Sequence, residues 1–268
     1  MQLRHVITAL EEIAPPYLAE DWDNTGLLLD PPGNASVKGI LLTIDLSEAV
    51  VSEAVRLGCQ IIVAYHPILF NPIQHLRNDD CNQRVVMKAI REGISVYSPH
   101  TALDAVSGGV NDWLSDGIGP GSRTPIIPGP PDKESNPSHG QGRLISLKKA
   151  VSARTVVSRY KRHLSLTKVR AAFPKGQNSS KRIRRVAVCA GAGSSVLSKS
   201  RADMYVTGEM KHHDILDALS NNTIVVLSEH THTERGYLPI MKKLLSARLP
   251  QNMIIRISKA DREPVQWI

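Results

Sequence analysis

Short apolar runs alternate with amphipathic segments along most of the chain, and this alternation is the strongest constraint on its fold. The run Gly39–Asp45 precedes a segment with helical spacing, Glu48–Leu57, which precedes a second apolar run, Gln60–Tyr65. Ser47 is a suitable N-cap for that helix, and Gly58 is a suitable residue to end it. Strands that alternate with helices form βαβ units, in which helices cover a parallel sheet. The sequence therefore predicts an α/β fold with mostly parallel sheets flanked by helices.

The same rhythm extends in both directions from these elements. We expect further helices at 3–13, 82–91, 151–164 and 210–219, and one that runs from 233 or 234 to 245. We expect further strands at 94–97, 142–147, 168–173, 185–190, 202–207 and 223–227.

A stretch rich in proline and glycine, Gly117–Gly142, interrupts the alternation. It holds six prolines and six glycines in 26 residues, so it cannot keep a helix and is a poor central strand. We interpret it as a linker or a long excursion. The expected organisation is a first α/β half with metal ligands (1–116), the linker (117–142), a basic middle segment (143–185) and a second α/β segment that completes the metal site (186–268).

Positive charge is concentrated in the middle of the chain. The segment Arg143–Arg185 holds fourteen Lys or Arg residues and no Asp or Glu, whereas the rest carries 19 basic and 25 acidic residues. Such a block can attract an anionic substrate or dock a protein partner, although a solvated surface is the more common explanation. Nucleic acid is a less favoured partner, because the block lacks interleaved aromatic residues and a helix-turn-helix pattern.

Cysteine usage and hydropathy limit the compartment. Cys59, Cys81 and Cys189 form no Cys-x-x-Cys pair, so neither a disulfide framework nor a thiolate zinc site is expected. No apolar run reaches the roughly 18 to 20 residues that span a bilayer, and the first 16 residues do not read as a secretory signal. We expect a cytoplasmic protein without a membrane partner, with the nucleus and the mitochondrion as alternative locations.

Histidines and carboxylates follow three of the predicted strands: His66, His100 with Asp104, and His230 with Glu234. Ligands of open α/β folds gather at the carboxyl ends of strands, so these side chains are candidates for one shared crevice. Imidazole nitrogen together with carboxylate oxygen suits Zn, Mn, Fe, Co or Ni, whereas an all-oxygen site favours Mg or Ca. A bridging carboxylate can hold two ions, which activate a shared water at neutral pH. Hydrogen-bonded structural histidines are the alternative, because sequence does not show that the three strand ends converge.

Five ordered segments resemble the motifs of one known family: AEDWDNTGLLL, AYHPILF, SPHTALD, TGEMKHHDILDA and SEHTHTERGYL. The match is to the Nif-three-like family, also catalogued as the GTP cyclohydrolase I type 2 or dinuclear metal centre family, and extends from about Leu3 to Leu245. The long Pro/Gly stretch and the sequence YHP are similar to its eukaryotic branch. The resemblance implies a Nif-three-like fold with two interleaved α/β halves. It also implies a ring-like homo-oligomer, often a hexamer.

The resemblance implies roles for individual residues as well. Metal ligation falls to His66, Asp104, His230 and Glu234, with Glu234 as the bridge between two ions. His100 is implied to be the catalytic proton donor or acceptor, or a ligand of a second ion.

One position departs from the family pattern, because many members carry two adjacent histidines where this chain has Tyr65 and His66. A neutral tyrosine is a poor metal ligand, so the sequence leaves two alternatives, one divalent ion per chain or two. The remaining candidates for the pocket or its surroundings are Tyr65, Glu209, His212, His213 and His232. Adjacent histidines on a helix point about 100° apart, so His212 and His213 are not expected to bind the same ion.

Two further features have a simpler and a more specific interpretation. The loop Gly191–Ser195 can cradle a phosphate with its backbone amides, but a plain tight turn is the commoner case. Trp22 can stack on a base, but a core anchor beside a turn is the expected role.

Two classes of function follow. The first is a dinuclear-metal hydrolase in which metal-bound hydroxide attacks a nucleotide or phosphoester-type substrate, a small anion, while His100 moves protons. Nothing in these residues selects guanine. The alternative is a non-catalytic protein that binds a transcriptional co-regulator through segment 143–185 and uses its metal for structure or sensing. Metal storage is a third, weaker hypothesis.

Overall fold

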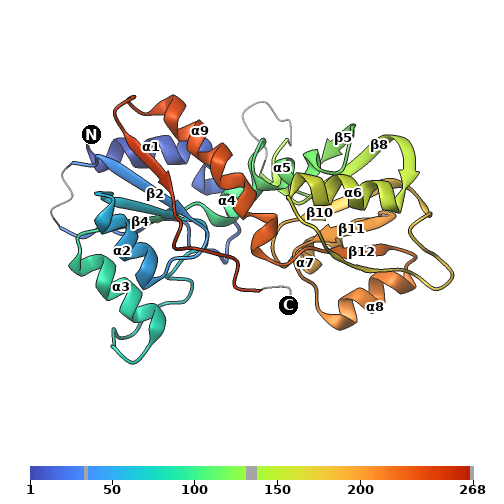
Figure 1. Ribbon diagram of the computed structural model, residues 1–268, viewed down its shortest axis with the longest axis horizontal. Coiled ribbons are helices and arrows are strands. Elements are labelled where there is room, and N and C mark those ends of the chain that lie inside the picture. Colours follow the sequence, from blue (N-terminus) through green and yellow to red (C-terminus); the bar gives the residue numbers. More distant parts are fainter. Residues whose placement is uncertain (33–35, 131–137, 266–268) are drawn as a thin grey trace. The chain divides into compact units, whose positions relative to one another are not determined.

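The computed structural model describes residues 1–32, 36–130 and 138–265, and these fold as two α/β units (Figure 1). The first unit combines Met1–Leu103 with Tyr237–Ile268, and the second comprises Asp104–Gly236. The chain therefore leaves the first unit, builds the second and then returns. The predicted α/β class with helix-flanked sheets is confirmed.

Four pairings hold the five-stranded sheet of the first unit together, and three of them are parallel. β1 pairs antiparallel with β4 at one edge. β2 and β3 are buried along their full length, as expected for strands covered on both faces. The strand order is β1 (Gly26–Leu29), β4 (Ser95–Ser98), β3 (Ile61–Ala64), β2 (Gly39–Thr43) and β13 (Ile254–Ile257).

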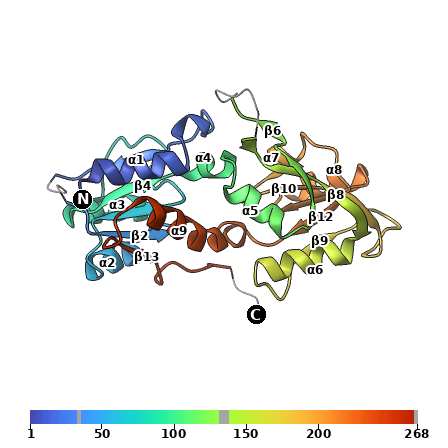
Figure 2. The ribbon, with the colours of Figure 1, turned by 90° about the horizontal axis from the view of Figure 1, so that it is seen from above.

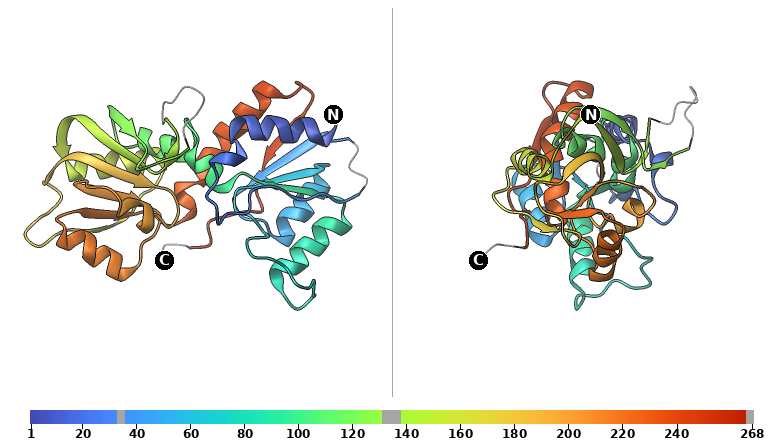
Figure 3. Two further views of the ribbon diagram at one scale, coloured as in Figure 1. Left: turned by 180° about the vertical axis from the view of Figure 1, so that it is seen from behind. Right: turned by 90° about the vertical axis from the view of Figure 1, so that its right-hand side faces the viewer.

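Helices cover both faces of this sheet. α1 and α9 lie side by side on one face, and α2 and α3 lie on the other (Figures 1 and 3). Ser47 caps α2, because its hydroxyl oxygen accepts from the backbone N–H of Val50 at 3.3 Å. The helices are α1 (Leu3–Ile13), α2 (Glu48–Arg56), α3 (Cys81–Arg91) and α9 (Leu238–Arg248), and a 3₁₀ turn, η1 (Pro16–Leu18), follows α1.

The second unit has a mixed sheet rather than the mostly parallel one expected. β10, β11 and β12 are parallel neighbours, whereas β5–β8, β8–β10 and β12–β9 pair antiparallel. The first half of β8 alternates between buried and half-buried residues, a pattern typical of antiparallel strands. The order is β5 (Gly121–Thr124), β8 (Arg143–Ser152), β10 (Arg182–Cys189), β11 (Met204–Thr207), β12 (Ile224–Leu227) and β9 (Arg170–Ala172).

The helices of the second unit lie on both faces of its sheet, with α6 and α8 on opposite sides (Figure 2). Ser152 caps α6 by accepting from the backbone N–H of Thr155 at 3.2 Å. The core between the sheet, α7 and α8 is formed by small and branched residues such as Ala187, Leu197 and Val225. The helices are α5 (Val110–Asp116), α6 (Ala153–His163), α7 (Ser194–Leu197) and α8 (His212–Ser220), and α4 (His100–Ala105) crosses from the first unit into the second.

The Pro/Gly-rich stretch contributes to the second unit rather than separating two halves. It supplies β5 at the edge of the six-stranded sheet, and β6 (Ile127–Pro128) pairs with β7 (Gly140–Gln141). Edge strands tolerate proline and glycine, because only one side of the strand must pair. Residues 131–137 of the predicted linker lie outside the described residues. The unit boundaries fall at Leu103 and Tyr237 rather than at the expected 116 and 186, because α9 and β13 return to the first sheet.

Arg143 begins the basic middle segment but lies in the interior of the second unit, where its side chain is only 1% exposed. Its guanidinium group donates to both carboxylate oxygens of Asp112, at 2.7 and 3.0 Å. It also donates to four backbone carbonyl oxygens, those of Ala105, Val106, Gly140 and Gly142. Arg143 therefore ties β8 to α5 and to the start of the unit, and it is not available to a docking partner.

Replacing Arg143 by Met will lower the free energy of unfolding by about 3–5 kcal/mol, because the half-buried Asp112 carboxylate loses its counter-ion and four backbone carbonyl oxygens lose their donor. Urea denaturation followed by circular dichroism measures this change. Lys148→Met, at an exposed position of the same strand, is the matched control and should stay within about 0.5 kcal/mol of the wild type. Equal stability of the two variants would show that the buried ion pair does not support the fold.

Candidate functional site

His66 and His100 follow two neighbouring parallel strands of the first unit, β3 and β4. The carboxyl ends of parallel strands meet at the same edge of the sheet, and the centroids of the two imidazole rings are 5.5 Å apart. The ring of Tyr65 contacts both, at centroid distances of 5.1 Å to His66 and 5.6 Å to His100. The structure thus brings these three predicted residues together.

Each of these histidines is held by a carboxylate that the sequence analysis did not select. Nδ1 of His66 lies 2.8 Å from Oδ1 of Asp45, and Nδ1 of His100 lies 2.8 Å from Oδ1 of Asp23. A proton on Nδ1 that is donated to a carboxylate fixes the tautomer and the ring orientation, and it makes Nε2 the basic nitrogen. Both aspartates were visible in the sequence, Asp45 at the end of an apolar run and Asp23 in the segment WDNTG.

The Asp23 carboxylate is the most strongly fixed group of this cluster. Its side chain is fully buried, and it accepts from the backbone N–H of Thr101 at 3.1 Å and from the Thr101 hydroxyl at 2.5 Å. Burial alone would raise the pKa of Asp23, but the hydrogen bonds from His100 and Thr101 and the attraction to His100 outweigh it and lower that pKa. His100 has a φ of +24°, a strained conformation for a residue with a side chain. These bonds hold it in place.

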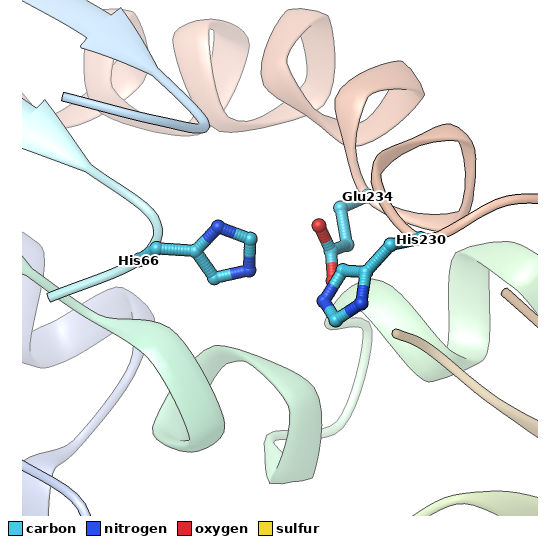
Figure 4. A group of neighbouring side chains, drawn as sticks. All are labelled: His66, His230 and Glu234. Atoms are coloured by element: carbon cyan, nitrogen blue, oxygen red, sulfur yellow. The ribbon is translucent and has the colours of Figure 1, made fainter. Parts of the chain in front are cut away.

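In the second unit, His230 and Glu234 project from the segment that follows β12 (Figure 4). Nε2 of His230 is 3.3 Å from Oε1 of Glu234, whose side chain is only 2% exposed. Nδ1 of His230 lies 2.8 Å from Oε1 of Glu209, so a carboxylate orients this ring as well. The helix expected from 233 or 234 begins only at Leu238, and two 3₁₀ turns precede it, η2 (Thr231–Thr233) and η3 (Arg235–Tyr237).

The backbone of Gly191 lies directly against His230 and Glu234. A Cβ atom at position 191 would lie 2.9 Å from Nε2 of His230 and 3.0 Å from Oε1 of Glu234. The φ of Gly191 is +59°, which disfavours any residue with a side chain. Its N–H donates to Oγ1 of Thr233 at 2.8 Å. The glycine loop is thus a tight turn, as the simpler interpretation predicts, and it leaves room beside the two donor atoms.

The other predicted residues have different surroundings. Nδ1 of His232 lies 2.8 Å from the carbonyl oxygen of Ser228, a backbone contact rather than a carboxylate contact. His212 and His213 are both exposed at the start of α8, with ring centroids 5.5 Å apart. Asp104 is the first residue of the second unit and is half-buried in α4, where its carbonyl oxygen accepts from Asn111 at 3.1 Å.

The donor atoms of the second unit have the separation that a metal ion requires. Two ligands at about 2.1 Å from a tetrahedral ion lie about 3.4 Å apart, close to the 3.3 Å between His230 and Glu234. A carboxylate on the far nitrogen of a ligating histidine is a common feature of metal sites. Imidazole nitrogen and carboxylate oxygen suit Zn, Mn, Fe, Co or Ni. The residues present therefore fit a divalent metal.

The family model of Duf34/NIF3 (NGG1p interacting factor 3) matches residues 1–264. The chain belongs to this family. It is 39% identical over 264 residues to NIF3-like protein 1 of Drosophila melanogaster, covering 98% of this chain and 88% of that one. It is 37% identical over 286 residues to NGG1-interacting factor 3 of Saccharomyces cerevisiae, covering 98% and 96%.

The fold is shared with solved structures of the family. A Bacillus cereus protein related to NIF3 superposes with a TM-score of 0.83 at 21% identity, covering 99% of this chain and 98% of that one. The predicted family and its NIF3 fold are confirmed. None of the helices in the described part of the chain has the length and apolar character needed to cross a membrane.

Replacing Asp23 by Asn will lower the free energy of unfolding at pH 7 by about 1–3 kcal/mol, because charged hydrogen bonds are lost. Folding lowers the pKa of Asp23 from its ordinary 3.8. The stabilisation is therefore fully present above pH 3.8 and is lost as the pH falls further through the folded-state pKa. The difference between wild type and variant should shrink in that acidic range.

Urea denaturation at pH 7 and at several values below 3.8 measures this dependence. Asp79→Asn, on a carboxylate that is 66% exposed, provides the control and should show no comparable trend. A wild-type-to-variant difference that stays constant across the acidic range would contradict the assignment to the Asp23 carboxylate.

Proposed function

We propose that this protein is a metal-dependent hydrolase with His66, His230 and Glu234 among the ligands of a divalent ion. The His230–Glu234 pair carries the proposal, because Glu209 orients it and Gly191 leaves space beside it. His66 supports it with the same design, since Asp45 engages its Nδ1 and makes Nε2 the ligating nitrogen.

Two further residues bear on the number of ligands and ions in the proposed metal site. We assign Asp104 as an additional ligand, in agreement with the family motif SPHTALD. Tyr65 occupies the position of a second histidine, but it is 4% exposed and its ring packs on His66 and His100. We therefore expect one tightly held ion per chain and a weaker second position at which Glu234 would act as the bridge.

The bound ion would supply a Lewis acid that lowers the pKa of water and polarises a phosphoryl or carbonyl oxygen. His100 is the proton carrier of this proposal. Its Nε2 can accept a proton from the attacking water and return it to the leaving group. The buried Asp23 carboxylate holds the ring in one orientation, as the aspartate of a catalytic triad does. The substrate class is a small anion, either a nucleotide or another phosphoester.

Metal content tests the proposal directly. Protein purified without chelators or a His tag should carry about one divalent ion per chain by plasma mass spectrometry, and Glu234→Gln should lose most of it, because an amide is a weaker ligand than a carboxylate. Glu209→Gln should bind about 10–100-fold more weakly, because it loosens the His230 ring. Asp79→Asn is the control. Equal, negligible content in wild type and variants after reloading with Zn²⁺, Mn²⁺ or Co²⁺ would overturn the metal site.

The same preparations test catalysis. Reloaded wild type should hydrolyse members of a panel of nucleotides and p-nitrophenyl phosphate, and chelator-treated protein should not. His100→Gln should lower the rate by about 10²–10⁴-fold with its metal content unchanged. Equal rates before and after metal removal would leave a metal site without hydrolysis.

A second candidate function is supported by the surface of the second unit and by a relative. Lys148 and Lys149 on β8 and Arg182, Arg184 and Arg185 on the neighbouring β10 are all exposed. The yeast relative is named as an NGG1-interacting factor. We propose that this basic face docks an acidic segment of a protein partner.

Charge reversal at Lys148, Lys149 and Arg184 should abolish co-purification with NGG1p and leave metal content unchanged, because these side chains are exposed and far along the strands from the buried Arg143. Reversal of Arg77, an exposed residue of the first unit, is the control. Unaltered co-purification of the triple variant would exclude the basic face as the docking surface.

A further inference from the structure

Two large aromatic side chains of the first unit are exposed next to one another. Trp22 is 58% exposed and Phe70 is 47% exposed, and their ring centroids are 5.9 Å apart. Trp22 is therefore not the core anchor that the sequence analysis expects. Its neighbour Asp23 takes the interior position instead, with a fully buried side chain. Adjacent exposed rings are costly to leave in water and commonly mark a binding surface.

Both rings contact His100, the proposed proton carrier. The Trp22 centroid is 6.1 Å from the His100 ring and the Phe70 centroid is 6.4 Å from it, with interplanar angles of 79° and 78°. On the other side, the buried Tyr65 ring lies 5.6 Å from His100. His100 thus has a buried aromatic neighbour and two exposed ones, and only the exposed pair can receive a ligand.

The backbone fixes this pair relative to the Asp23–His100 hydrogen bond. Trp22 immediately precedes Asp23, which holds His100. The next residue, Asn24, donates from Nδ2 to the carbonyl oxygen of Leu69 at 2.5 Å, and Leu69 immediately precedes Phe70. Both loops that carry the exposed rings are therefore joined to each other and to the same histidine. A ring bound against Trp22 and Phe70 would therefore have a defined position relative to Nε2 of His100.

We infer that Trp22 and Phe70 bind a flat aromatic ring of the substrate and thereby place its reacting group at His100. The inference rests on the proposed hydrolase function and narrows its substrate to anions that carry an aromatic or heteroaromatic ring, such as nucleotides, rather than sugar phosphates. Stacking on an indole or phenyl face requires no charge and accepts any base, because every base has a π-face. Trp22 and Phe70 act as positioning residues and take no proton.

The test compares ligands with and without a ring. Guanosine, adenosine and uridine 5′-monophosphates are titrated calorimetrically into the full chain, with ribose 5-phosphate as the ring-free match, before and after metal loading. Trp22→Ala and Phe70→Ala should each weaken binding of the nucleotides that the wild type binds by about tenfold or more, and Trp22→Phe should restore most of it. Ribose 5-phosphate affinity should not change. Val55→Ala, at a side chain that is 45% exposed on α2, is the control.

Four results would overturn the inference. They are the absence of saturable binding for all three nucleotides, wild-type affinity in both alanine variants, an equal loss for ribose 5-phosphate, or a change of mass in Trp22→Ala by light scattering. The last would show that the rings cover a second copy of the chain. Metal content is measured separately in each variant. Ring-dependent nucleotide binding in a protein that takes up no metal would contradict the hydrolase proposal but support the binding site at Trp22 and Phe70.

Discussion

In the described part of the chain, three histidines each place Nδ1 within hydrogen-bond distance of a carboxylate, and the chemistry that we propose depends on these contacts. Asp45 holds His66, Asp23 holds His100 and Glu209 holds His230. Without these bonds each ring could rotate and exchange its proton between two nitrogens. With them, the same nitrogen, Nε2, becomes the basic one in all three rings. In the proposed function, the metal ligands and the proton carrier would thus be oriented before an ion or a substrate binds.

The fold supplies these pairs through the ends of parallel strands. β2, β3 and β4 of the first unit end at the same edge of the sheet, so Asp45, His66 and His100 meet there although they are far apart in the sequence. In the second unit, β10, β11 and β12 are parallel in the same way. Gly191, Glu209 and His230 follow these strands one by one. Within each unit, the candidate residues lie after parallel strands, and the second unit has its antiparallel strands toward the edges of its sheet.

Local sequence signals predicted most helices and strands, but they could not predict contacts between residues that are far apart in the sequence. Ser47 is visible as an N-cap because capping involves residues three positions apart. The burial of Arg143 could not be predicted from the sequence, because its partner Asp112 belongs to another element. The positive charge of Arg143 also makes it look like its exposed basic neighbours. The histidines were found by their position after strands, but their carboxylate partners depend on which strands become neighbours. The prediction that Trp22 is a core anchor was wrong, because no local sequence signal shows that Asp23 is the residue whose side chain points into the interior.

The discontinuity of the first unit has a consequence for the order in which the chain can fold. β13 pairs in parallel with β2, but it is synthesised only after the entire second unit. Until then, one edge of β2 has no strand to pair with, and α9 is missing from one face of the sheet. The second unit is continuous in sequence and can complete its own sheet on the ribosome. The nascent first unit therefore carries an open strand edge, the kind of surface that chaperones protect from aggregation.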